Sequence, residues 1–285
     1  MNAHAPAPAD RDPAPFALTR GSAPLLLSIP HAGTFVADAL RARFTDAAQA
    51  LPDTDWHVPL LYDFASSLGA STLIATHSRY VIDLNRPPDD HSLYPGQDTT
   101  GLCPIDTFDR AALYRDGEAP AGAEIARRLD AVHRPYHQAL AAELARLRDV
   151  HGSVVLWDAH SIRSVVPRFF DGRLPDFNLG TAGGASAAPA LSATLGAIAA
   201  AAEGYTAVHN GRFKGGHITR RYGAPEAGIH AVQLELAQCT YMDEDAPYRY
   251  RDERAARVKP HLRAMLDAAI AFAAAPRDGA AGNAR

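Results

Sequence analysis

The fold of this chain is decided by the stretch Leu25-Leu26-Leu27-Ser28-Ile29-Pro30-His31-Ala32-Gly33. Four of its first five residues are apolar, and Pro30 and Gly33 follow at once, a pattern typical of a short buried strand that ends abruptly. His31 therefore follows the carboxyl end of a predicted strand, where open α/β sheets bind their ligands. A single histidine there more often only binds a neighbouring loop, so the functional interpretation depends on a second strand of the same kind.

That second strand is 154–161, an apolar run that ends in a polar cluster holding Asp158, His160 and Ser161. A third apolar run, 231–236, is interrupted by Glu235. A glutamate inside a buried strand is costly unless it is paired, lies near a metal or transfers protons. Two histidines and one glutamate from three predicted strands outline a zinc hydrolase.

Composition limits the class of protein. The chain has 285 residues and a mass of 30.4 kDa, with 47% hydrophobic and 21% charged residues, as expected of one large globular domain. A net charge of -4 gives no basis for binding nucleic acid. The sequence has no apolar run of 18 residues that would indicate a membrane protein. Its two cysteines, Cys103 and Cys239, are too few for a disulfide framework, so we expect a reduced, cytoplasmic location.

The order of predicted elements indicates one domain. We expect a disordered N-terminal tail at 1–15, a single catalytic α/β domain at 16–275 and a flexible C-terminal tail at 276–285. Strands alternate with helices, which predicts a three-layer α/β sandwich with a mostly parallel mixed sheet. Beyond the three strands above, the pattern predicts strands at 71–76, 79–84, 176–180 and 205–209, helices at 37–50, 58–65, 121–150, 190–202 and 248–274, and a long surface loop at 92–104.

The strongest helical pattern, 121–150, contains His133 and His137, four residues apart. Zinc proteases use this spacing in H-E-x-x-H, but here no glutamate follows the first histidine and Pro135 lies between the two. We therefore expect packing or surface roles for both histidines, and a kink or break of the helix at Pro135.

The expected chemistry is that of a catalytic zinc ion, which takes three protein ligands and leaves a position for water. His31 and His160 supply two ligands, and the carboxylate is Asp53, Asp55 or Glu235. Glu235 suits proton transfer better than ligation, because its strand is distant in sequence from the acidic loop that can complete the ligand set.

Cations near these segments indicate an anionic substrate. Arg79 and Arg86 bracket one predicted strand, and Arg212 and Lys214 lie in the glycine-containing loop 210–223. A guanidinium group binds a carboxylate through two hydrogen bonds, which gives orientation as well as affinity.

Taken together, these segments resemble the N-formylglutamate amidohydrolase (deformylase) family from about residue 15 to residue 250. The match is carried by Ser28-Ile29-Pro30-His31-Ala32-Gly33, Asp53-Thr54-Asp55-Trp56, Ser78-Arg79-Tyr80-Val81-Ile82-Asp83-Leu84-Asn85-Arg86, Asp158-Ala159-His160-Ser161, Lys214-Gly215-Gly216 and Gln233-Leu234-Glu235-Leu236.

The resemblance implies a zinc-exopeptidase (phosphorylase/hydrolase)-like fold and hydrolysis of N-formyl-L-glutamate to formate and L-glutamate, the last step of one bacterial route of histidine degradation. It implies zinc, or another divalent metal, held by His31, His160 and a residue of the acidic loop, for which we expect Asp55 rather than Asp53. Glu235 matches the catalytic carboxylate. Thr34 stands where related zinc peptidases have a glutamate three residues after the first histidine.

For the substrate carboxylates we expect contacts from Arg79, Arg86 and Lys214, assisted by Asn85, and we expect Asp158 to orient a histidine. The alternatives are a zinc amidase or peptidase acting on other N-acyl amino acids or peptides, and a binding protein for acidic metabolites without activity. The sequence makes no prediction of the oligomeric state.

Overall fold

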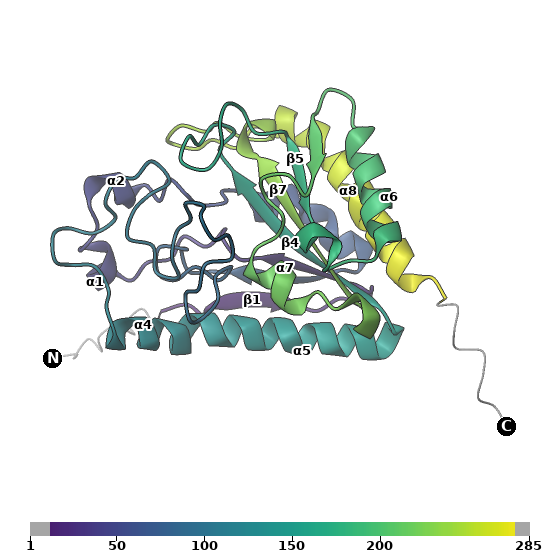
Figure 1. The fold of residues 1–285 in the computed structure, drawn as a ribbon, viewed down its shortest axis with the longest axis horizontal. Helices are drawn as coiled ribbons and strands as arrows, with labels where there is room; N and C mark the ends of the chain where they lie inside the picture. The colour runs from purple at the N-terminus through teal and green to yellow at the C-terminus, as the bar shows by residue number, and fades with distance from the viewer. Residues whose placement is uncertain (1–11, 277–285) are drawn as a thin grey trace, which may run out of the picture.

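The computed structural model describes residues 12–276, which fold around a seven-stranded sheet (Figure 1). The strand order is β1-β3-β2-β4-β7-β5-β6, and the four neighbours β3, β2, β4 and β7 are parallel to one another. Strands β1 and β5 pair antiparallel with β3 and β7, so the predicted α/β class and mostly parallel mixed sheet are confirmed. The strands are β1 (Phe16–Thr19), β2 (Leu25–Ile29), β3 (Ser71–Ala75), β4 (Val154–Ile162), β5 (Phe177–Gly180), β6 (Ala207–His209) and β7 (Ile229–Ala237).

Helices cover both faces of the sheet (Figure 1). Helix α5 packs on one face, and α6 and α8 pack on the other. The helices are α1 (Asp38–Arg41), α2 (Asp46–Gln49), α3 (Val58–Leu61), α4 (Ala123–Arg128), α5 (Arg134–His151), α6 (Pro189–Ala200), α7 (His217–Tyr222) and α8 (Asp252–Ala274), with short 3-10 turns at Asp63–Leu68, Ala182–Gly184, Pro225–Ala227 and Gln238–Thr240.

Successive side chains of the central strands point to opposite faces of the sheet, which divides the hydrophobic core into two clusters. Leu27 and Trp157 point to the cluster that contains residues of α8, whereas Leu26 and Leu156 point to the cluster that contains Tyr136 of α5. All of these side chains are fully buried, and burying a large apolar side chain stabilises the fold by about 1.5–3 kcal/mol. Because both faces are covered, the central strands consist mostly of apolar residues, as parallel strands usually do, and most of their polar residues lie toward the carboxyl ends.

Several predicted elements differ from the structure. Residues 79–84 are not a strand but a series of turns, in which the Arg79 guanidinium binds the Asp83 carboxylate four residues later. The apolar residues between them have high β propensity, but contacts distant in sequence override it. The predicted helix 37–50 is two short helices, α1 and α2, joined by a turn.

The long predicted helix 121–150 exists, but it consists of α4 and α5 joined by a π-helical turn at Leu129–His133. This wider turn lies directly before Pro135, which has no backbone N–H to donate to the preceding turn. The break at Pro135 therefore takes the form of a local change of helix type, and α4 and α5 lie along one line in Figure 1.

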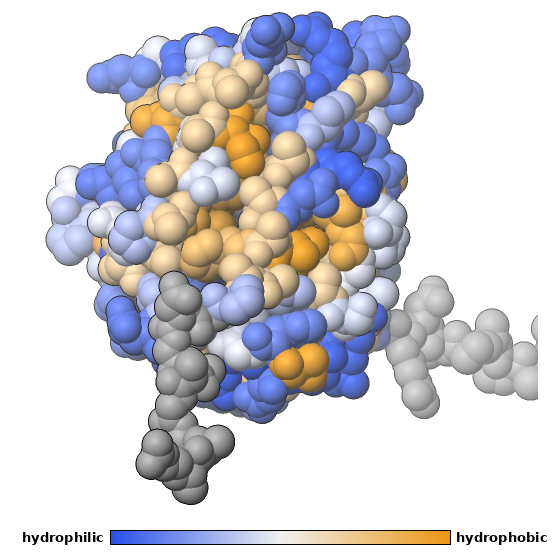
Figure 2. All heavy atoms as spheres, turned by 90° about the vertical axis from the view of Figure 1, so that its right-hand side faces the viewer, coloured by the Kyte–Doolittle hydropathy of each residue, from blue (hydrophilic) through white to orange (hydrophobic). Residues whose placement is uncertain are grey.

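The outward side of α6 carries small apolar residues, since Ala193, Ala197 and Ala200 are all exposed. Figure 2 shows a mildly apolar band on this side of the molecule, bordered by polar residues. None of the helices within residues 12–276 combines the length and the apolar character needed to cross a membrane. The predicted tails, 1–15 and 276–285, fall almost entirely outside the described residues.

Candidate active site

Two imidazoles lie together at the carboxyl edge of the sheet, as the strand pattern predicts. Strands β2 and β4 are parallel neighbours with Ser28 opposite Asp158, so the residues that follow these positions leave the sheet at the same edge. His31 and His160 therefore meet, with 4.8 Å between the ring centroids and 4% of each residue exposed.

A carboxylate from the acidic loop joins these two rings. Asp55 Oδ2 lies 3.1 Å from His160 Nδ1 and 3.8 Å from His31 Nδ1. The backbone fixes this position, because the Asp55 N–H donates to the carbonyl of His31 and the Ser161 N–H donates to Asp55 Oδ2. One possible ligand atom from each of the three residues lies within 4.8 Å of the others, which is close enough for all three to reach one metal ion.

The outer nitrogens of both rings are held by carboxylates. His31 Nε2 lies 2.7 Å from Asp83 Oδ1, and His160 Nε2 lies 3.0 Å from Asp158 Oδ2. A carboxylate only accepts, so each Nε2 carries a proton and each Nδ1 faces Asp55. Carboxylate-to-histidine bonds of this kind orient imidazoles that bind metals.

The two rings differ in their affinity for protons. Burial and the nearby Arg79 guanidinium lower the pKa of His31. Burial also disfavours the charged form of His160, but Asp158 and Asp55 outweigh this effect and hold the pKa of His160 well above its usual value. His160 would therefore have to give up a proton to hold a metal ion, as is usual for histidine ligands.

The charge of this region favours a cation. Asp55, Asp83 and Asp158 are each at most 1% exposed, and the Arg79 guanidinium lies 2.7 Å from Asp83 and 3.9 Å from Asp55. Burying unpaired charges is expensive, so an excess of buried carboxylates indicates a site for a positive ion. Two imidazole nitrogens and one carboxylate oxygen form an established ligand set for zinc. The residues present therefore fit a divalent metal.

Asp53, the other acidic candidate, has a different environment. Its Oδ2 accepts hydrogen bonds from the Tyr80 hydroxyl at 2.7 Å and from the Phe108 N–H at 2.9 Å. Burial raises its pKa. Asp53 thus holds the loop that carries Phe108, whereas Asp55 lies with the histidines.

Glu235 is the register partner of His160 across the β4–β7 pair and is 8% exposed. Burial raises the pKa of Glu235 to about 8, with Asp55 adding to the effect and His160 opposing it. Gln233 Nε2 donates to its Oε2 at 3.3 Å. A carboxyl group that titrates near neutral pH is suited to general acid–base chemistry.

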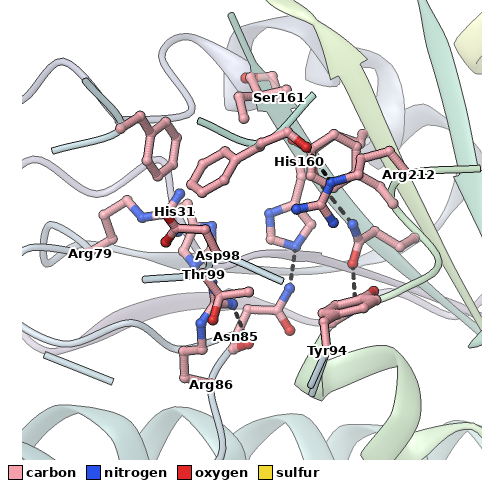
Figure 3. Close-up of a pocket in the computed structure, with 17 residues that line it drawn as sticks. His31, Arg79, Asn85, Arg86, Tyr94, Asp98, Thr99, His160, Ser161 and Arg212 are labelled. Carbon is pink, nitrogen blue, oxygen red and sulfur yellow. Dashed lines mark hydrogen bonds between the residues drawn. The ribbon is translucent and has the colours of Figure 1, made fainter. Parts of the chain in front are cut away.

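A cavity opens beside these residues (Figure 3). It has an empty volume of about 640 Å³ including its mouth, and both histidines and Glu235 line it. Its other walls include guanidinium groups and aromatic rings, namely Arg79, Arg86, Arg212, Tyr94, Phe108, Phe169 and Phe213. The carboxylate of Asp98 also lines the cavity, but it is paired with Arg110 and Arg168.

The three guanidinium groups are not equivalent. Arg79 is paired with Asp83 at 2.7 Å. Arg86 and Arg212 form no ion pair with a carboxylate of residues 12–276: Arg86 Nε donates to the Thr100 carbonyl at 2.7 Å, and Arg212 Nε donates to the Phe169 carbonyl at 2.5 Å. Two cations that line a cavity without an acidic partner can bind two carboxylates of a ligand.

Lys214 is exposed and is not among the residues that line the cavity. Arg212, two residues earlier in the same loop, lines it instead. The sequence marks both as cations of a glycine-containing loop, but only Lys214 is in the predicted binding set. Asp83, the partner of His31, is also missing from that set, although it lies within the segment 78–86 that carries the family resemblance and four residues after Arg79.

Asn85 lies at the base of the cavity. Its Nδ2 is 3.0 Å from His160 Nε2 and 3.5 Å from Asp158 Oδ2, and its Oδ1 accepts from the Ile218 N–H at 2.8 Å. Gly216 packs closely against it, since a Cβ at this glycine would lie 2.4 Å from Asn85 Nδ2. Any larger residue at position 216 would displace the amide from the histidine.

Known proteins resemble this chain over most of its length. Residues 23–242 match the family model described as N-formylglutamate amidohydrolase. An N-formylglutamate deformylase of Pseudomonas aeruginosa is 59% identical over 253 residues, which cover 89% of this chain and 95% of that protein, and one of Pseudomonas putida is 54% identical over 255 residues, covering 90% and 95%. The crystal structure of an N-formylglutamate amidohydrolase from Ralstonia eutropha JMP134 has a TM-score of 0.75 and 28% identity, covering 91% of this chain and 97% of that one.

Proposed function

Since this chain belongs to the N-formylglutamate amidohydrolase family, we propose that it hydrolyses N-formyl-L-glutamate to formate and L-glutamate. The observation that carries the proposal is one cavity lined by His31 and His160, which lie with Asp55, and by the guanidinium groups of Arg86 and Arg212. These two guanidinium groups form no ion pair with a carboxylate within residues 12–276. The substrate has a matching distribution of groups, a formyl amide beside two carboxylates. Within the observed α/β fold, the zinc-exopeptidase-like classification is part of the same proposal.

We assign His31, Asp55 and His160 as the ligands of a divalent metal, for which zinc suits the donor set. Such an ion would polarise the formyl carbonyl and make a water molecule more acidic. Asp83 and Asp158 orient the two imidazoles through their Nε2 atoms.

Glu235 acts as the general base and acid. Its carboxylate accepts a proton from the attacking water and donates it to the amide nitrogen of the departing glutamate, so the group ends the cycle in its starting state. Burial supports this role, because it raises the pKa of Glu235 to about 8 and makes the protonated form accessible near neutral pH.

Arg86 and Arg212 bind the two substrate carboxylates, with Asn85 completing the base of the cavity. Arg79 lines the cavity but is already bound to Asp83, so its main role is to fix the carboxylate behind His31. Lys214 is exposed and attracts the anionic substrate toward the site.

Replacing either unpaired arginine should weaken substrate binding. Arg86→Met and Arg212→Met each remove charge-assisted hydrogen bonds while keeping an apolar stem, so KM for N-formylglutamate should rise by roughly 10- to 100-fold in steady-state formate release. Lys214→Met is the matched control, and KM should change by less than about threefold because exposed charges contribute little. An effect of Lys214→Met as large as that of Arg212→Met would contradict the assignment.

The reaction itself is tested by measuring formate released by the purified protein. N-formylglutamate should be cleaved much faster than N-acetylglutamate, N-formylaspartate or N-formylnorvaline, which change the acyl group, the side-chain length or the side-chain charge. Equal rates with the acetyl compound would favour a broader N-acyl amidase. Tight binding without formate release would favour a binding protein. The place of the reaction in histidine degradation and the cytoplasmic location remain predictions from the sequence.

A further inference from the structure

Three histidines cluster behind the wall of the cavity. The rings of His133 and His137 are 4.2 Å apart between centroids, and His217 lies 5.4 Å from His137 and 6.4 Å from His133. None of the three lines the cavity. Two of them are the pair whose spacing resembles a metal motif, and the catalytic proposal gives them no role.

These histidines bind three consecutive backbone carbonyls. His137 Nε2 lies 2.9 Å from the carbonyl of Leu84, and His133 Nε2 lies 2.9 Å from the carbonyl of Arg86. Between them, the carbonyl of Asn85 accepts from the backbone N–H of His217 at 3.4 Å. His133 and His137 thus bind the chain through Nε2, and His217 binds it through its backbone N–H, so these contacts point to a structural role rather than to a second metal site.

The protonation of His137 is fixed by its neighbours. Burial, together with His133 and His217, lowers the pKa of His137 to about 3, so the ring is neutral and carries one proton. A carbonyl only accepts, so this proton is on Nε2 and points to Leu84. The Tyr222 hydroxyl lies 3.0 Å from Nδ1 and 3.1 Å from the carbonyl of His137, so both acceptors share its one proton, and the Tyr222 ring stacks on the imidazole.

The bound segment, Leu84–Arg86, connects several parts of the site. Asp83, directly before it, holds His31 and also accepts from the Asn85 N–H at 2.8 Å. Asn85 contacts His160, and the Arg86 side chain enters the cavity. The segment has no helix or strand of its own, so its position depends on such side-chain contacts.

We propose that His137 and His133 are positioning residues that act through Arg86: their Nε2–H groups hold the Leu84–Arg86 backbone so that the Arg86 guanidinium stays in place to bind a substrate carboxylate. This inference rests on the proposed function of the cavity. It also accounts for the four-residue spacing of the two histidines, because residues four apart on a helix lie on one face and here reach carbonyls two residues apart.

The decisive experiment is a double-mutant cycle between His137 and Arg86. His137→Leu keeps the volume but removes the donor, and it should raise KM for N-formylglutamate about tenfold at unchanged metal content, since a buried carbonyl loses its partner. His137→Gln keeps a donor at the Nε2 position and an acceptor for Tyr222, and it should restore KM to within about threefold of wild type. In the Arg86→Met background, His137→Leu should cause little further change.

His151→Leu is the matched control. This histidine lies on the same helix, with Nε2 2.8 Å from the carbonyl of Ser22, and does not line the cavity, so KM should stay at the wild-type value. The inference is overturned if His137→Leu leaves KM unchanged, if His137→Gln fails to restore it, or if the effects of His137→Leu and Arg86→Met multiply. Failure of the proposed function is a distinct result, because the wild-type protein would then release no formate.

Discussion

Glu235→Gln should lower kcat for formate release by about a thousandfold, which lies within the 10²- to 10⁴-fold range of general acid–base catalysis. Glutamine has the shape of glutamate but accepts no proton from water at neutral pH. Since Glu235 is not one of the three proposed ligands, the variant should retain its metal, and KM should change little. Steady-state formate release measures kcat and KM, and elemental analysis of the same preparation measures the metal content.

The folding stability of the metal-free variant provides an internal control. The pKa of Glu235 is raised from 4.5 to about 8 by burial, so the wild-type fold favours the protonated carboxyl and loses stability as the pH rises through this range. Glutamine has no charge to bury, so metal-free Glu235→Gln should match or exceed metal-free wild type in thermal midpoint at pH 9. Turnover close to wild type would exclude the proposed proton transfer, whereas loss of metal would indicate that Glu235 is a ligand.

Removal of the metal by a chelator should abolish formate release and lower the thermal midpoint, and both should return when zinc is added. The buried carboxylates of Asp55, Asp83 and Asp158 lose their compensating charge when the ion leaves. An ion present at a thousandfold excess over its dissociation constant stabilises a fold by about 4 kcal/mol, which corresponds to roughly 10 °C for a chain of this size. Differential scanning calorimetry before and after chelation measures the shift.

Variants of the acidic loop identify the third ligand. Asp55→Asn should lose most of its bound metal, as should His31→Ala and His160→Ala, because all three side chains converge on one point. Asp53→Asn should keep its metal, since the Asp53 carboxylate binds Tyr80 and the Phe108 backbone instead. Full metal content in both histidine variants would contradict the assignment of His31 and His160 as metal ligands. Loss of metal only in Asp53→Asn would show that Asp53, rather than Asp55, is the third ligand.

The convergence of His31, His160 and Glu235 is predictable from the sequence because it depends on a simple rule. Parallel strands end at the same edge of a sheet, so polar residues at the ends of short apolar runs meet there. The apolar runs themselves mark β2, β4 and β7 to within a few residues of their observed bounds. The exact neighbours of each histidine do not follow from this rule.

The features of the site that the sequence does not predict depend on contacts between segments that are distant in the chain. Asp83 binds His31 from 52 residues away, and this pairing replaces the strand that the apolar residues of 79–84 predict. Which of Arg212 and Lys214 lines the cavity depends on the path of their loop, in which Asn210 and Gly215 have positive φ values of +51° and +112°. The role of His137 is likewise not predictable from the sequence, because its spacing from His133 does not indicate which backbone carbonyls the two rings will contact.

The parts of the site differ in what holds them in place. His31, His160 and Glu235 lie at or next to the ends of central strands, whereas Arg86 and Arg212 lie on irregular segments, the first between β3 and α4 and the second between β6 and α7. Protein engineering should therefore be able to redirect this scaffold toward formamides with other tails by randomising these two segments in a library while leaving the sheet unaltered. Such libraries should keep the hydrogen bond between His137 and the Leu84 carbonyl. Without it, residues 84–86 would lose their fixed position, and substrate affinity would fall before a new specificity could be selected.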